Sequence, residues 1–126
     1  MATIKSYTDI EQSKKLAEIL QLESVDMRYH TISKYNSYPC DETVYTIYFG
    51  NPSSDDIPCW SLAALLDVLN KTAYFMDEDG SVNLSSYKTV EWDLGINNSG
   101  LESVTESNPV DACYEMIIKL HERNLL

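Results

Sequence analysis

Cys59 is the residue of this sequence best placed to act as a nucleophile. Pro58 is typical of a first helical turn and an apolar segment follows it, so we expect a helix to begin there. The helix dipole and the free backbone amides would then favour the Cys59 thiolate. A catalytic thiol also needs a base, and neither His30 nor His121 lies near Cys59 in the sequence. We therefore favour a small buried cysteine, and keep a thiol-dependent enzyme using Cys59 as an alternative.

The acidic run at 77–80, Asp-Glu-Asp-Gly, is the second candidate because it starts like a calcium-binding loop. A loop of the EF-hand type needs glycine at its sixth position and a bidentate glutamate at its twelfth. Counted from residue 77, those positions hold Val82 and Lys88. We therefore interpret the run as a turn with solvated carboxylates. Its acids remain candidates for contact with a protein partner: Asp77, Glu78 and Asp79.

Other cofactor chemistry has no motif in the sequence. The four glycines form neither a P-loop nor a GxGxxG pattern, and the three cysteines and two histidines lack the spacing of a zinc site. His121 falls in the last turn of a predicted helix, where a protonated imidazole would be stabilised by the free carbonyl groups. We therefore predict no catalytic residue, no cofactor and no metal ligand.

Residues 27–38 interleave two cationic side chains with three tyrosines and contain no acid. Such a mixture can contact a protein partner or stack on bases, and the alternative is a tyrosine-rich connection packed on a sheet. Direct binding of nucleic acid is disfavoured because the whole chain carries a net charge of -11. The candidate partner-binding residues of this segment are Arg28, Tyr29, Lys34, Tyr35 and Tyr38.

Three elements that would position these residues have strong local signals. Thr8 and Glu11 have the spacing of a capping box, which predicts a helix over about 9–21. Residues 43–49 are almost all β-branched or aromatic, which predicts a strand. Asn108 followed by proline predicts the start of a final helix.

The remaining elements are predicted from weaker patterns. The apolar run after Pro58 predicts a buried helix over about 58–70, and 72–77 resembles a strand that turns at Asp79-Gly80. A return strand falls within 82–94. We expect residues 24–42 to form an irregular connection and residues 95–107 to form a surface loop.

This order, α-β-α-β-β-α, predicts the α+β class. We expect one domain over residues 1–126, with a mainly antiparallel sheet of about three strands packed against three helices. A length of 126 residues, with 44% hydrophobic and 23% charged residues, suits a single globular core.

Two stretches carry a resemblance to known proteins. The segments Pro58 to Leu66 and Asn108 to Cys113, the latter continuing to Lys119-Leu120-His121, resemble small acidic proteins of gut Bacteroidetes and of their phages or mobile elements. The resemblance implies a bacterial or phage setting in the cytoplasm. It brings no activity and no catalytic residue to this chain.

The charge of the chain is concentrated in its middle. Residues 41–111 hold 13 acidic and two basic residues, a balance that equals the net charge of the whole chain. Most of these acids fall at predicted connections between elements, so they would form one acidic end only if the fold brings those connections together.

The first residues lack the apolar stretch of a secretory signal, and no apolar run approaches the ~20 residues of a membrane span. With an odd number of cysteines, the sequence predicts a soluble cytoplasmic protein with free thiols.

The sequence as a whole favours a non-enzymatic acidic interaction protein, an accessory of a phage or mobile element, that binds a protein partner. The alternatives are the thiol-dependent enzyme and a DNA mimic that inhibits a nucleic-acid-binding enzyme. No membrane association is expected, and a monomer and a dimer both remain open.

Overall fold

The computed structural model describes residues 5–33, 43–76, 81–87, 91–97 and 102–126 of the chain. These residues form three α-helices, one short 3-10 helix and six strands. In chain order the elements are α1 (Ile10–Ile19), η1 (Leu22–Ser24), β1 (Met27–Ser33), β2 (Thr43–Phe49), β3 (Ile57–Cys59), α2 (Leu62–Met76), β4 (Ser81–Tyr87), β5 (Glu91–Asn97), β6 (Glu102–Glu106) and α3 (Pro109–Glu122).

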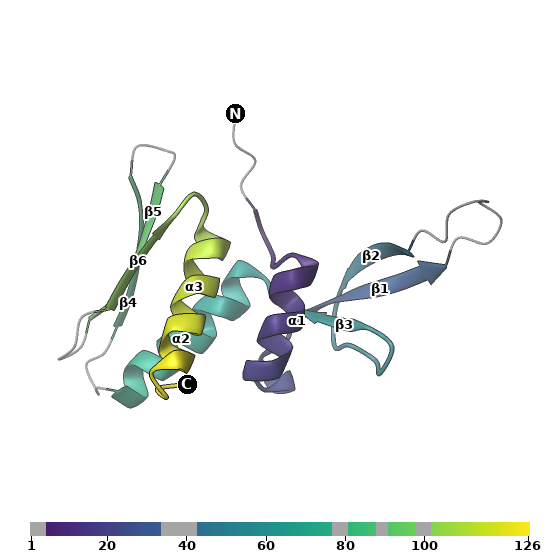
Figure 1. Ribbon diagram of the computed structural model, residues 1–126, viewed down its shortest axis with the longest axis horizontal. Coiled ribbons are helices and arrows are strands. Elements are labelled where there is room, and N and C mark those ends of the chain that lie inside the picture. The colour runs from purple at the N-terminus through teal and green to yellow at the C-terminus, as the bar shows by residue number, and fades with distance from the viewer. Residues whose placement is uncertain (1–4, 34–42, 77–80, 88–90, 98–101) are drawn as a thin grey trace.

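The strands form two sheets that lie on opposite sides of the helices (Figure 1). The first sheet has the order β2-β1-β3 and the second has the order β4-β5-β6. Every pairing in both sheets is antiparallel. The predicted α+β class with three helices is therefore confirmed, and each sheet has the expected three strands. The difference from the prediction is that the described residues contain two such sheets.

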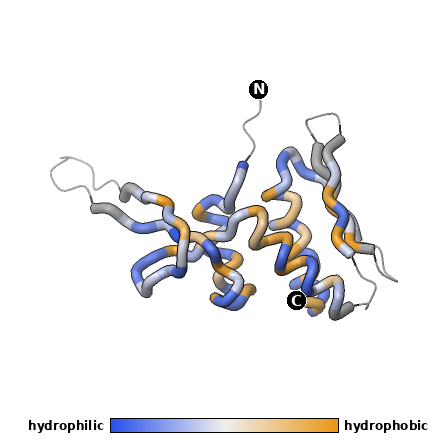
Figure 2. The backbone as a smooth tube through the Cα atoms, turned by 180° about the vertical axis from the view of Figure 1, so that it is seen from behind, coloured by the Kyte–Doolittle hydropathy of each residue, from blue (hydrophilic) through white to orange (hydrophobic). Residues whose placement is uncertain are grey.

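The larger core lies between the second sheet and the helices α2 and α3, where Figure 2 shows the hydrophobic stretches of the tube facing one another. Its buried positions on α2 recur every four residues, which is the period of one helix face. The fully buried residues of this core include Leu65, Leu69, Ala73, Leu94, Ile96, Met116, Ile117 and Leu120.

A smaller core lies between the first sheet and α1. Met27 and Tyr29 of β1 pack there together with Cys59 of β3, and Ile10 of α1 contacts them. Because successive strand residues point to opposite faces, the neighbours Arg28 and His30 point away from this core. The outer face of the first sheet thus carries the polar residues of β1.

The predicted start of α1 was wrong by one residue. The N-cap is Asp9, and its capping box is completed by Gln12. Thr8 has another role, because it is fully buried and its hydroxyl lies 2.8 Å from the Ser13 hydroxyl and accepts from the Trp60 backbone amide at 3.2 Å. At the start of α3 the prediction is confirmed, since Asn108 is the N-cap and a proline follows it.

Three of the strands lie in segments that are predicted as connections or as helix. β1 falls in the stretch 24–42, β6 falls in the stretch 95–107, and β3 covers the proline that was expected to start a helix. Each of the three is stabilised by pairing with another strand. The residue pattern within a single segment does not show such pairing. α2 begins only at Leu62, where the hydroxyl of the preceding Ser61 accepts from the Ala64 backbone amide at 3.2 Å.

The predicted strand at 72–77 is also wrong, because α2 continues to Met76. The four-residue spacing of its buried face extends through Ala73, so packing against the core favours helix there. The hairpin in this region joins β4 to β5, while the predicted turn at 77–80 lies outside the described residues.

Candidate functional site

A buried carboxylate, that of Asp56, organises the outer face of the first sheet. Its side chain has 0% exposure and accepts four hydrogen bonds. Oδ2 accepts from the Ser53 backbone amide at 2.9 Å, from the Ser53 hydroxyl at 3.0 Å and from Arg28 Nη1 at 3.0 Å. Oδ1 lies 2.8 Å from His30 Nδ1. The bond from the Ser53 amide, followed by the bond from His30, holds the pKa of Asp56 far below its ordinary value, although burial alone would raise it.

The fold places Asp56 there through the pairing of β3 with β1. In that pairing Arg28 lies opposite Pro58, two residues after Asp56. The loop before β3 is closed by the Asp56 backbone amide, which donates to the Ser53 carbonyl at 3.1 Å. The loop therefore delivers the carboxylate to the face of β1 that carries Arg28 and His30.

His30 is oriented by this carboxylate. An ionised carboxylate only accepts hydrogen bonds, so Nδ1 of His30 donates the proton in their contact. Nε2 lies at the opposite edge of the ring, and the His30 side chain is 46% exposed. Within the described part of the chain, no residue forms a hydrogen bond with Nε2 of His30. This nitrogen is an acceptor in the neutral ring and a donor in the protonated ring.

Arg28 and Tyr48 complete the outer face. They lie opposite each other in the pairing of β1 with β2, and the guanidinium carbon of Arg28 lies 4.9 Å from the centre of the Tyr48 ring. The His30 ring meets the same tyrosine edge to face, with centroids 6.3 Å apart. We call Arg28, His30, Tyr48 and Asp56 the Asp56 cluster. Its exposed part is aromatic and cationic, in a chain whose net charge is -11.

A groove with a volume of about 390 Å³ lies far from this cluster, beside α1 and α2, and a second of about 360 Å³ lies at the end of β2. The groove at β2 is bordered by Phe49, whose side chain is 80% exposed. Its lining comprises Ser6, Tyr7, Met27, Ile47, Tyr48, Phe49 and Ser61. Tyr48 therefore belongs both to this groove and to the Asp56 cluster.

The structure places two of the predicted contact residues. Arg28 is partly exposed on the outer face, as a contact residue must be. Tyr29 is buried in the small core, where its hydroxyl donates to the Thr8 carbonyl at 2.6 Å and burial raises its pKa. We therefore correct the prediction for Tyr29, which packs inward because it alternates with Arg28. The other candidates lie outside the described residues: Lys34, Tyr35, Tyr38, Asp77, Glu78 and Asp79.

Cys59 lacks the setting that would favour a thiolate. It ends strand β3 and is fully buried, with its sulfur 3.5 Å from the Thr8 carbonyl oxygen. Burial raises the pKa of the Cys59 thiol, and bonds with neighbours including Thr8 only partly offset this. The same applies to Cys113 in the large core, whose pKa is raised to about 12 by burial. The helix start that motivated the nucleophile is therefore not at Cys59.

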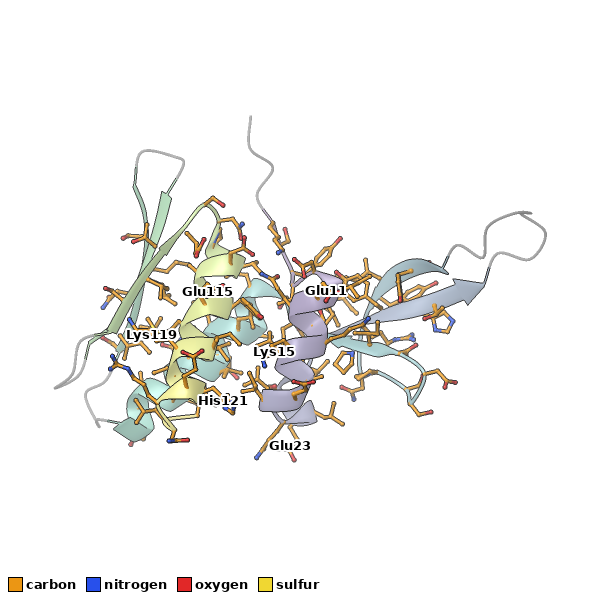
Figure 3. All side chains as sticks on the ribbon, in the orientation of Figure 1. Glu11, Lys15, Glu23, Glu115, Lys119 and His121 are labelled. Carbon is orange, nitrogen blue, oxygen red and sulfur yellow. The ribbon has the colours of Figure 1, made fainter. Side chains whose placement is uncertain are left out.

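The acids of the described residues are distributed over the molecule. Asp56 belongs to the first sheet and Glu106 to the second sheet at the opposite end. Figure 3 shows Glu11 and Glu115 among the cationic side chains Lys15 and Lys119 on one side of α1 and α3. The described acidic residues at connections between elements therefore do not form one acidic end.

Two further findings bear on the site. Across the described ranges, no group of three or more histidine, cysteine, aspartate or glutamate side chains is arranged to hold a metal ion. Among the described helices, none is both long and apolar enough to cross a membrane.

Sequence reasoning missed the partners of Arg28. The sequence does not indicate that His30 and Asp56 meet, because the two residues are 26 positions apart. The available signal was the alternation of Arg28 and His30 around a β-favouring aromatic, which is typical of a two-faced strand.

Comparison of the chain with models of protein families, with curated proteins and with solved structures finds no match.

Proposed function

We propose that this chain is a non-enzymatic binding protein that contacts a protein partner through the end of the first sheet, at Tyr48 and Phe49. The observation that supports this most directly is the 80% exposure of Phe49 beside an apolar groove. Burying a phenylalanine side chain is worth roughly 1.5–3 kcal/mol. A partner that covers Phe49 would gain this free energy, and aromatic side chains and arginine are the residues that dominate protein interfaces.

The backbone of β2 adds a second means of contact. β2 pairs with β1 along one edge, and its other edge pairs with no strand among the described residues. An exposed edge can accept an extended segment of another protein as an additional strand. Phe49 and Tyr48 point to opposite faces of β2, so a segment docked on this edge would meet both side chains.

The charge of the chain adds a preference for the partner. A net charge of -11 steers a basic protein toward this one and slows the approach of an acidic one. The setting we propose remains that of a bacterial, phage or mobile-element accessory in the cytoplasm.

The two alternatives receive less support from the described residues. A DNA mimic needs acids arrayed on one face, whereas the described acids are spread over both sheets and the helices, and some are bonded within the chain as Asp56 is. An enzyme using Cys59 would need the buried thiol to become accessible and ionised.

Affinity capture with matched variants tests the proposal. We expect the wild-type chain to enrich the same protein from bacterial host lysate in repeated experiments, and Phe49→Ala to reduce that enrichment at least about tenfold, which corresponds to the loss of one buried aromatic contact. Leu22→Ala is the control, because Leu22 is 64% exposed and lies on η1, away from the β2 groove. Quantitative mass spectrometry at two salt concentrations provides the measurement.

Both substitutions alter exposed side chains. The free energy of unfolding of each variant should therefore lie within about 0.5 kcal/mol of that of the wild type. Equal enrichment by the wild type and by Phe49→Ala, with both folded, would place the contact elsewhere and remove the basis of the proposal.

A further inference from the structure

The Asp56 cluster contains hydrogen-bond donors that bond to no other group among the described residues. Arginine has five N–H donors, and Arg28 directs one nitrogen, Nη1, to Asp56. Within the described ranges, the other contact of the Arg28 guanidinium is with the Tyr48 ring, whose centre lies 4.9 Å from the guanidinium carbon. The Arg28 side chain is 30% exposed.

These donors are already held in position before a ligand binds. The two oxygens of one buried carboxylate fix Arg28 and His30, and the Tyr48 ring lies against both. Donors that are already oriented lose little conformational freedom when they bind, which is why preorganised sites gain affinity. Arginine in particular pairs with carboxylates and phosphates through two parallel hydrogen bonds.

We propose that Arg28 and His30 form a binding site for a single oxyanion group, a phosphate or a carboxylate, on the outer face of the first sheet. The free N–H groups of Arg28 donate to the anion, and Nε2 of protonated His30 donates from the neighbouring position two residues along β1. Asp56 is a positioning residue, because both of its oxygens are already occupied. The site shares Tyr48 with the proposed partner contact, whereas Phe49 lies on the other face of β2 and takes no part in anion binding.

Titration with inorganic sulfate tests the site. The ring signals of His30 would be followed by NMR at constant ionic strength, with chloride replaced by sulfate. We expect a saturable shift of the His30 signals. His121, an exposed histidine on α3, is the internal reference for unspecific effects.

Variants separate a binding site from a structural clamp. Arg28→Gln should abolish the saturable shift, and Arg28→Lys, which keeps the charge without the planar fork, should weaken binding about tenfold. Asp56→Asn should weaken it too, because His30 and Arg28 lose their fixed orientation. Where Arg28→Gln does not fold, Arg28→Lys carries the comparison. Phe49→Ala should leave the sulfate response unchanged, which distinguishes this site from the partner contact.

A parallel titration with acetate identifies the kind of oxyanion. A stronger response to sulfate indicates a phosphate group, and a stronger response to acetate indicates a carboxylate. The proposal is overturned if the His30 signals move no more than those of His121 with either anion, or if Arg28→Gln retains the full response.

Discussion

At the scale of single residues, Asp56 shows how a buried charge shapes its surroundings. A carboxylate without exposed surface is stable only when donors replace the water it has lost, and Asp56 has four such hydrogen bonds. They fix a loop, an arginine and a histidine at once. The useful groups of the site are therefore exposed, while the group that positions them is hidden.

Because the pKa of Asp56 is lower in the folded chain than in the unfolded chain, its contribution to stability is complete above the unfolded value. That contribution is lost progressively as the pH falls from about 4, the ordinary aspartate pKa, toward the folded pKa. We expect Asp56→Asn to lower the unfolding midpoint clearly at neutral pH and by less at acidic pH. Urea denaturation of both proteins across this range measures it.

Asp67→Asn is the control for the pH series. Asp67 pairs with Lys71 at 2.9 Å on the exposed side of α2, where a salt bridge contributes little. Its substitution should change stability by less than about 0.5 kcal/mol at every pH. An Asp56→Asn protein as stable as the wild type at neutral pH would contradict the role given to the buried carboxylate.

At the scale of elements, α3 and β2 have clear local signals and are predicted well, whereas β1, β3 and β6 are not. The start of α3 follows from Asn108 and the proline after it, since both act within one helical turn. β1 is different, because it alternates an inward Tyr29 with outward Arg28 and His30 and becomes a strand through pairing with β2. The sequence between β1 and its partner strand β2 has no regular hydrophobic period that would indicate the pairing. Strand pairing between distant segments is information that a local pattern does not hold.

The cap of α3 gives a measurable element-scale prediction. Asn108 accepts from the Asp111 backbone amide at 2.8 Å, so Asn108→Ala should destabilise the protein by about 1 kcal/mol. Thermal or chemical denaturation followed by circular dichroism measures the loss. Ser107→Ala, at the exposed neighbouring position, should have almost no effect. If Asn108→Ala and Ser107→Ala lose equal stability, the loss in Asn108→Ala does not come from the helix cap.

At the scale of the whole molecule, the ends of two helices are joined by one side chain. Nζ of Lys5 lies 3.0 Å from Asp9 at the start of α1 and 2.9 Å from Asp111 at the start of α3. Gln12 supports the joint by bonding Asp111 at 2.7 Å. This contact ties the helix that carries the first sheet to the helix that carries the second.

We expect Lys5→Met to destabilise the protein by about 1–3 kcal/mol, because it leaves the partly buried carboxylate of Asp111 and the exposed carboxylate of Asp9 without their shared cation. Lys71→Met is the matched control, since it removes one cation from an exposed pair and should cost less than about 0.5 kcal/mol. Chemical denaturation at neutral pH compares the two. A smaller effect for Lys5→Met than for Lys71→Met would show that the joint is not important.

The sequence by itself determined the α+β class, the helices α1 and α3, the strand at 43–49 and the buried state of Cys59. These follow from spacing and residue type within a few turns or a single strand. Only the tertiary structure decided that there are two sheets, that Tyr29 points inward, and that Asp56 meets Arg28 and His30. The physical reason is that strand pairing and the burial of a charge join residues far apart in the chain, and their free energy appears only once the fold has brought them together.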